Sequence, residues 1–94
     1  MWLHTVAAGG VIALGTGFGI DRHDWLWIVL AIGLVWTAEA FNTAIERLAD
    51  ALTMERDPRI AIVKDVAAAG VLVSATAAAI IGLLIFGPLF LGFR

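Results

Sequence analysis

The sequence predicts an all-α integral membrane protein, a single domain of residues 1–94 that crosses the bilayer with three helices. Hydrophobic residues make up 62% of the chain and charged residues only 15%, whereas an ordinary soluble chain is about half apolar and about a quarter charged. Three apolar segments cover about residues 2–20, 25–52 and 58–86, and each can supply the ~20 residues that cross a bilayer. The net charge of −2 gives no indication of a nucleic-acid partner, and the lack of cysteine excludes disulfides and thiolate metal sites.

The first segment, residues 2–20, carries small residues at every fourth position. These residues are Thr5, Gly9, Ala13 and Gly17. Such spacing predicts a flat helix face for close helix–helix contact. Residues 21–24 then predict a short polar hairpin, followed by Trp25 and Trp27 at the membrane interface. We interpret His4 and His23 as solvated side chains rather than metal ligands.

The second segment, residues 25–52, is roughly 40 Å long as a helix and exceeds the ~30 Å hydrocarbon core. Its C-terminal half carries polar residues three and four positions apart, which form one stripe on a helix. The stripe consists of Glu39, Asn42, Thr43, Glu46 and Asp50. Glu39 lies roughly 21 Å beyond Trp25 along the axis, still at lipid depth, while Asp50 projects towards water. Acids at lipid depth are expensive, so the stripe marks a functional site.

The third segment begins at Asp57-Pro58, because Asp is a favoured N-cap and Pro a favoured first helical residue. Gly87-Pro88 predicts its end near Phe86, followed by an interfacial tail over residues 89–94. A second small-residue face contains Gly70, Ser74, Ala78 and Gly82. Such faces invite contacts with neighbouring chains, so we expect a homo-oligomer.

The basic residues predict the orientation in the membrane. Most of them surround the second loop, namely Arg47, Arg56, Arg59 and Lys64, whereas the first hairpin holds Arg22. The positive-inside rule places the second loop in the cytoplasm. The N-terminus is then cytoplasmic as well, and the C-terminus lies outside.

The polar stripe suggests phosphate chemistry at the cytoplasmic end. Counting residues around the second loop places Lys64 level with Glu46. Carboxylate and amide oxygens suit Mg²⁺, which proteins usually hold with one or two carboxylates and substrate phosphates, and Lys64 would bind phosphate oxygens. Glu39, deeper in the membrane, suits a general base for a lipid hydroxyl. Alternatively, these polar residues serve only as interhelical contacts, with a self-neutralising pair of Lys64 and Glu46.

Two blocks of sequence resemble the signature of the prokaryotic diacylglycerol kinase/undecaprenol kinase family. They read Glu39-x-x-Asn42-Thr43-Ala44-Ile45-Glu46-x-x-x-Asp50 and, fourteen residues later, Lys64-Asp65-x-Ala67-Ala68. The resemblance extends over nearly the whole chain. It implies a small homotrimeric inner-membrane enzyme that transfers the γ-phosphate of ATP, with Mg²⁺, directly to a lipid alcohol. The sequence lacks a Walker motif, as this family does.

The resemblance also implies roles for individual residues. Glu39 matches the general base that acts on the lipid hydroxyl, and Asn42 the neighbouring catalytic residue that orients the reacting groups. Glu46 matches the metal ligand. The positions on the nucleotide side are Glu46, Asp50, Lys64 and Asp65, with the loop residues Glu55, Arg56 and Asp57 near the adenosine. Ala68 falls where the family keeps a small residue beside the lipid.

The sequence differs from the pattern of this family at the start of the chain. Family members begin with an amphipathic surface helix carrying a glutamate that shares the metal with the residue equivalent to Glu46. The present sequence begins near the first apolar segment. We therefore expect the metal to have one family ligand rather than two.

Three alternatives remain open from the sequence. Within the lipid kinases, the sequence Asn42-Thr43-Ala44-Ile45-Glu46 favours undecaprenol over diacylglycerol as the acceptor. A non-catalytic membrane scaffold that kept the helical bundle is a second hypothesis. A proton-coupled transporter using Glu39 is a third, and it leaves Asp50, Lys64 and Asp65 without a role.

Overall fold

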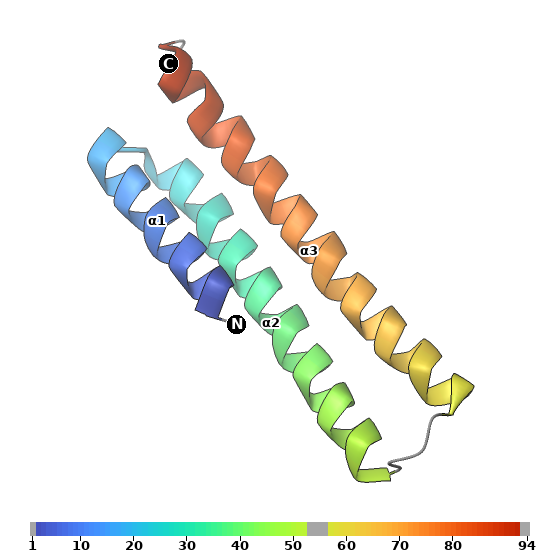
Figure 1. The fold of residues 1–94 in the computed structure, drawn as a ribbon. Coiled ribbons are helices and arrows are strands. Elements are labelled where there is room, and N and C mark those ends of the chain that lie inside the picture. Colours follow the sequence, from blue (N-terminus) through green and yellow to red (C-terminus); the bar gives the residue numbers. More distant parts are fainter. Residues whose placement is uncertain (1, 53–56, 93–94) are drawn as a thin grey trace.

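The structure, a computed structural model, describes residues 2–52 and 57–92, and this part of the chain is built from α-helices. Helix α1 covers Trp2–Phe18, α2 covers Arg22–Leu52 and α3 covers Pro58–Leu91. Helices α2 and α3 run antiparallel along most of their lengths, and α1 lies beside the first half of α2 (Figure 1). The molecule is elongated, with principal extents of 54 × 18 × 17 Å. The predicted all-α fold is confirmed.

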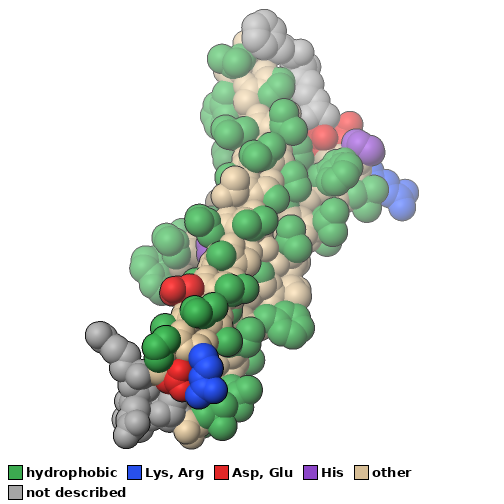
Figure 2. Space-filling view, turned by 90° about the vertical axis from the view of Figure 1, so that its right-hand side faces the viewer, with side chains coloured by type: hydrophobic (Ala, Val, Ile, Leu, Met, Phe, Trp, Pro, Cys, Tyr) green, Lys and Arg blue, Asp and Glu red, His purple; other side chains and the backbone are tan. Residues whose placement is uncertain are grey.

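The surface of the molecule is that of a membrane protein. Among the described helices, α2 and α3 are long and apolar enough to cross a membrane, whereas α1 is apolar but has 17 residues. Large apolar side chains such as Leu83 and Leu84 are more than two-thirds exposed. Hydrophobic side chains cover most of the face in Figure 2, and the charged ones gather towards its two ends. Because a soluble monomer rarely exposes so much contiguous apolar surface, this surface is suited to lipid and to other helices.

The turn between α1 and α2 is shorter than the predicted polar hairpin of residues 21–24. Helix α1 ends in a Schellman motif, in which Gly19 adopts a φ of 64° and the Ile20 N–H donates to the Gly15 carbonyl. Helix α2 begins directly afterwards, because the Asp21 carboxylate accepts a hydrogen bond of 2.9 Å from the Asp24 N–H. Residues 22–24 are therefore helical, and the predicted start of α2 at Trp25 is wrong by three residues.

Helix α3 begins where the sequence predicts. Asp57 is its N-cap and accepts a hydrogen bond of 2.9 Å from the Arg59 N–H, and Pro58 is the first helical residue. The Arg59 guanidinium also donates to the Asp57 carboxylate at 2.9 Å. The side-chain and backbone hydrogen bonds from Arg59 hold the pKa of Asp57 below its usual value.

The predicted end of α3 at Phe86 is wrong. The helix continues through Pro88 to Leu91 and ends at Gly92, which adopts a φ of 76°. A proline inside a helix removes one backbone hydrogen bond and its ring crowds the carbonyl four residues earlier, so the helix needs other contacts to continue beyond Pro88. Aromatic packing supports the last turns, because the Phe18 ring lies 5.1 Å from the Phe90 ring and 6.4 Å from the Phe86 ring. Residues 89–91 of the predicted tail are therefore helical.

The best-buried core lies at the end of the bundle that holds the α1–α2 turn. Ile28 of α2 packs there with Ile85 and Phe86 of α3. The two small-residue faces differ in their surroundings. The face on α3 turns towards the other helices, since Ser74 is buried, whereas the face on α1, for example Gly9, is exposed.

Gly15 of α1 packs closely against Trp25 of α2, which leads to a stability prediction. A Cβ at Gly15 would lie 2.8 Å from the Trp25 ring and 3.0 Å from the Ile20 side chain, whereas a Cβ at Gly10 would meet nothing within 4 Å. We expect Gly15→Ala to lower the free energy of unfolding by about 1–3 kcal/mol relative to Gly10→Ala, because it overpacks this contact. Gly10→Ala should raise the free energy of unfolding by up to about 1 kcal/mol, because alanine has a higher helix propensity than glycine.

Unfolding in mixed detergent micelles, followed by tryptophan fluorescence, measures both variants. Equal stabilisation by the two alanines would contradict the close contact of α1 with Trp25.

Candidate functional site

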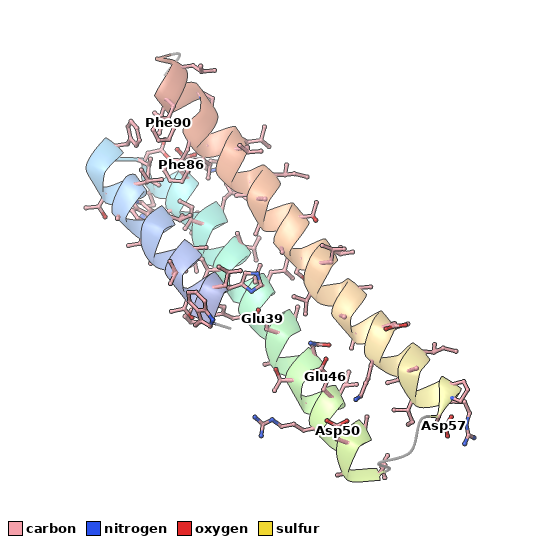
Figure 3. The ribbon with its side chains drawn as sticks, viewed as in Figure 1. Glu39, Glu46, Asp50, Asp57, Phe86 and Phe90 are labelled. Carbon is pink, nitrogen blue, oxygen red and sulfur yellow. The ribbon has the colours of Figure 1, made fainter. Side chains whose placement is uncertain are left out.

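The predicted polar stripe forms on one continuous helix, α2. Burial decreases along it: Glu39 is buried with 9% of its surface exposed, Asn42 is half-buried, and Glu46 and Asp50 are exposed. Figure 3 shows Glu39, Glu46 and Asp50 following one another down α2, with Asp57 at the start of α3. The stripe therefore runs from the interior of the bundle to its polar end, as the sequence predicts.

Glu39 contacts a histidine that the sequence reading had interpreted as solvated. The His4 Nδ1 atom of α1 contacts the Glu39 Oε1 atom of α2. The side chain of His4 is 27% exposed and that of Glu39 is 11% exposed. The interpretation of His4 as a solvated residue is therefore wrong. His23 is exposed as expected, and its Nε2 accepts a hydrogen bond of 3.2 Å from Trp27.

A signal for the His4 contact was present in the sequence. Counting residues backwards and forwards from the α1–α2 turn places the start of α1 level with the middle of α2, because the two helices are antiparallel neighbours. The residue count that places Lys64 level with Glu46 around the second loop can also be applied to the first turn. There it places His4 near the level of Glu39.

Asn42 lies close to one helical turn beyond Glu39. Its Oδ1 atom is buried and has no hydrogen-bond partner within the described part of the chain. Leaving a buried carbonyl oxygen without a partner costs free energy. Such an atom is suited to a ligand, because a bound donor or cation would compensate this cost.

At the polar end of the site, the ion pair of Lys64 differs from the predicted one. The Lys64 Nζ atom of α3 lies 2.6 Å from the Asp50 Oδ1 atom of α2. The ion pair thus joins Lys64 to Asp50, one helical turn beyond the predicted partner Glu46. The predicted pairing of Lys64 with Glu46 is therefore replaced by a pairing with Asp50, and Glu46 is exposed between this pair and Glu39.

The remaining predicted site residues have varied surroundings. Asp65 and Ala68 are exposed on α3, and Ala68 does not line the groove described below. Asp57 is engaged by its own helix, through the cap and the ion pair with Arg59. Glu55 and Arg56 lie outside the described residues.

An apolar groove of about 240 Å³ opens beside the buried end of the stripe. His4 lies at its start, together with Trp36 of α2 and Ala75 of α3, and it extends between the three helices to Ile28 and Gly82. Since the residue numbers fall along α2 from Trp36 to Ile28, the groove runs away from Glu46 and Asp50. Glu39 therefore lies between an apolar groove on one side and a row of oxygen atoms on the other.

The donor atoms suit a magnesium ion that substrate phosphates help to hold. Glu46 supplies one carboxylate, and Asn42, one turn earlier, supplies a buried oxygen that has no partner among residues 2–52 and 57–92. Within the described residues, no group of three or more His, Cys, Asp or Glu side chains could hold a metal. Mg²⁺ is commonly held by one or two carboxylates, with water and phosphate completing its shell. The residues thus fit a nucleotide-bound Mg²⁺ better than a closed protein site.

Comparison with known proteins gives one family and one relative. The family model for prokaryotic diacylglycerol kinase matches residues 1–86. Undecaprenol kinase of Bacillus subtilis (strain 168) is 40% identical over 85 residues, which cover 90% of this chain and 69% of that protein. No solved structure matches the chain. The matched residues include the whole polar stripe of α2 and the Lys64-Asp65 sequence of α3.

Proposed function

Because this chain belongs to the prokaryotic diacylglycerol kinase family and is a lipid kinase of the membrane, we propose that it transfers the γ-phosphate of ATP to undecaprenol. The single observation that carries this proposal is the position of Glu39. Its carboxylate contacts His4, which lines the near end of the apolar groove, and the polar stripe of α2 continues on its other side. A lipid hydroxyl from the groove and a phosphate from the polar end can therefore meet near Glu39.

Glu39 acts as the general base in this proposal. It accepts the proton of the lipid hydroxyl while the hydroxyl oxygen forms a bond to the γ-phosphorus. The bond between that phosphorus and the β,γ-bridging oxygen breaks, and ADP leaves with the electron pair. Asn42, within one turn of Glu39, orients the reacting groups through its side-chain amide. Burial of Glu39 excludes water, which would otherwise compete with the lipid as the acceptor.

The nucleotide occupies the polar end of the site. Glu46 and the Asn42 oxygen would hold Mg²⁺, which neutralises charge on the phosphates when bound. Lys64 attracts the phosphate oxygens, and its contact with Asp50 keeps it on the α2 side of α3. Asp65 and the loop residues 55–57 are the candidate contacts for the rest of the nucleotide.

The groove favours a lipid with one chain at its hydroxyl. A polyprenol presents a single hydrocarbon chain, whereas a diacylglycerol presents two. The groove volume of about 240 Å³ lies below the range of roughly 300–1,000 Å³ usual for ligand pockets, which suits one chain. The name of the Bacillus relative, undecaprenol kinase, also supports this acceptor.

The exposed small residues of α1 support the proposed assembly, and the basic residues support the proposed orientation. The small residues along α1, including Gly9 and Gly17, are exposed and open to another helix, which supports a homotrimer. The basic residues Arg47, Arg59 and Lys64 lie towards the end that holds Asp50, since Lys64 pairs with Asp50, Arg59 with the cap of α3, and Arg47 lies in the last turns of α2. By the positive-inside rule this end faces the cytoplasm of a bacterial inner membrane, where ATP is present.

The acceptor is tested with purified protein in mixed micelles. We expect radiolabel from γ-labelled ATP to appear in undecaprenol at a kcat/KM at least about tenfold above that for diacylglycerol, which corresponds to about 1.4 kcal/mol of discrimination. Each lipid is offered alone and then in competition, with and without Mg²⁺.

Faster labelling of diacylglycerol would contradict the assigned acceptor. Labelling of neither lipid, in protein shown to be folded and oligomeric, would contradict the kinase function.

A further inference from the structure

His4 is the ionisable side chain that meets the buried carboxylate of the site. It comes from α1, whereas the polar stripe lies on α2, and the two residues are 35 positions apart. The Nδ1 atom of His4 contacts the Oε1 atom of Glu39, and both side chains are largely buried. Within residues 2–18, His4 is the one ionisable side chain that the sequence provides.

Helix α3 has no ionisable residue from Val66 to Leu91. Along α2 the nearest ionisable residues are Glu46, about 10 Å further along the axis, and Asp24, about 22 Å in the other direction. His4 therefore brings an ionisable side chain from α1 into contact with Glu39.

We propose that His4 is a positioning residue for Glu39, whose carboxylate it orients at lipid depth. In the tautomer with a proton on Nδ1, the imidazole donates a hydrogen bond to Oε1 of the carboxylate. The contact fixes the plane of the carboxylate relative to the groove, since His4 itself lines the groove. A carboxylate held in this direction can accept the proton of an alcohol that enters from the groove.

A histidine suits this place better than a lysine or an arginine. A neutral imidazole supplies an N–H donor without a permanent charge in an apolar region, where a full charge is expensive. Its ring is short and stiff, so the donor is held in one direction. The role rests on the proposed function, because it assigns His4 to the base of the phosphoryl transfer.

Two substitutions separate hydrogen bonding from packing. His4→Asn places an amide N–H near the position of Nδ1 and retains the donor, whereas His4→Leu retains apolar bulk and removes the donor. We expect kcat to fall roughly tenfold to a hundredfold in His4→Leu, as for other residues that orient a functional group. The KM for ATP should not change, and His4→Asn should recover most of the activity. His23→Leu, at the far end of α2, serves as the control with unchanged activity.

Infrared difference spectra of the Glu39 carboxyl band, assigned by its loss in Glu39→Gln, measure the hydrogen bond from His4 without turnover. A shifted band in His4→Leu, and a band at the parent frequency in His4→Asn, are the expected results. An identical band in the parent and in His4→Leu would overturn the role of His4, whatever the activities are. A parent that phosphorylates no lipid would instead contradict the proposed function, and the band frequency would still decide whether His4 positions Glu39 by a hydrogen bond.

Discussion

Replacing Glu39 by Gln is expected to lower kcat for lipid phosphorylation by roughly 10²- to 10⁴-fold, the usual contribution of a general base. Gln has nearly the same shape as Glu and can still contact His4, but it cannot accept the proton of the lipid hydroxyl. The KM for ATP should change little, because Glu39 lies on the groove side of the stripe. Initial rates with labelled ATP at saturating lipid measure the effect.

The matched control for Glu39→Gln is Asp21→Asn. This change also removes one carboxylate charge, but at the opposite end of α2, and Asn caps helices as well as Asp does. It should leave kcat and the oligomeric state unchanged. Equal activity of Glu39→Gln and the parent would show that Glu39 is not the base.

Replacing Glu46 by Gln is expected to produce a second large loss, on the order of a hundredfold or more, because charge stabilisation by a bound metal is worth several kcal/mol. The character of the loss should differ from that of Glu39→Gln. Glu46 is exposed on α2, within one turn of the unpartnered Asn42 oxygen. Its removal weakens the binding of Mg²⁺ with the nucleotide, so the Mg²⁺ concentration for half-maximal rate should rise.

A titration of Mg²⁺ at fixed ATP distinguishes the two variants. High Mg²⁺ should recover part of the activity of Glu46→Gln and none of that of Glu39→Gln. The same half-maximal Mg²⁺ concentration in Glu46→Gln and the parent would remove Glu46 from the metal site.

The helices and the polar stripe could be predicted from the sequence because both depend on local periodicity. Glu39, Asn42, Glu46 and Asp50 repeat every three or four residues, and α2 is helical throughout. The order of these residues from lipid depth to water also follows from their distance along the axis. These features depend on the geometry of one helix, whereas the burial of Glu39 also needs its neighbour His4 on α1.

Some helix ends could be predicted from the sequence and others could not. The Asp57 cap of α3 was recognised, whereas Asp21, which caps α2 in the same way, was assigned to a polar hairpin. The difference was the proline after Asp57, which strengthens the signal. Pro88 predicted too early an end for α3. The packing of Phe90 on Phe18 supports a last turn beyond the proline.

The contacts between helices could be predicted only in part. Lys64 pairs with Asp50 instead of Glu46, because a long lysine side chain can reach an acid one helical turn away, and a residue count does not tell which acid it chooses. The groove and the contact of His4 with Glu39 depend on the packing of all three helices. No periodicity within one helix could have indicated them.

The most direct measurement follows the label of γ-labelled ATP in proteoliposomes that contain undecaprenol, with the parent and Glu39→Gln side by side. Direct transfer from nucleotide to lipid predicts label in the lipid of the parent, none on the protein at any time, and almost none in the lipid of Glu39→Gln. Label that first appears on the protein and then moves to the lipid, or equal labelling of the lipid by both proteins, would contradict transfer assisted by Glu39 at the head of the groove.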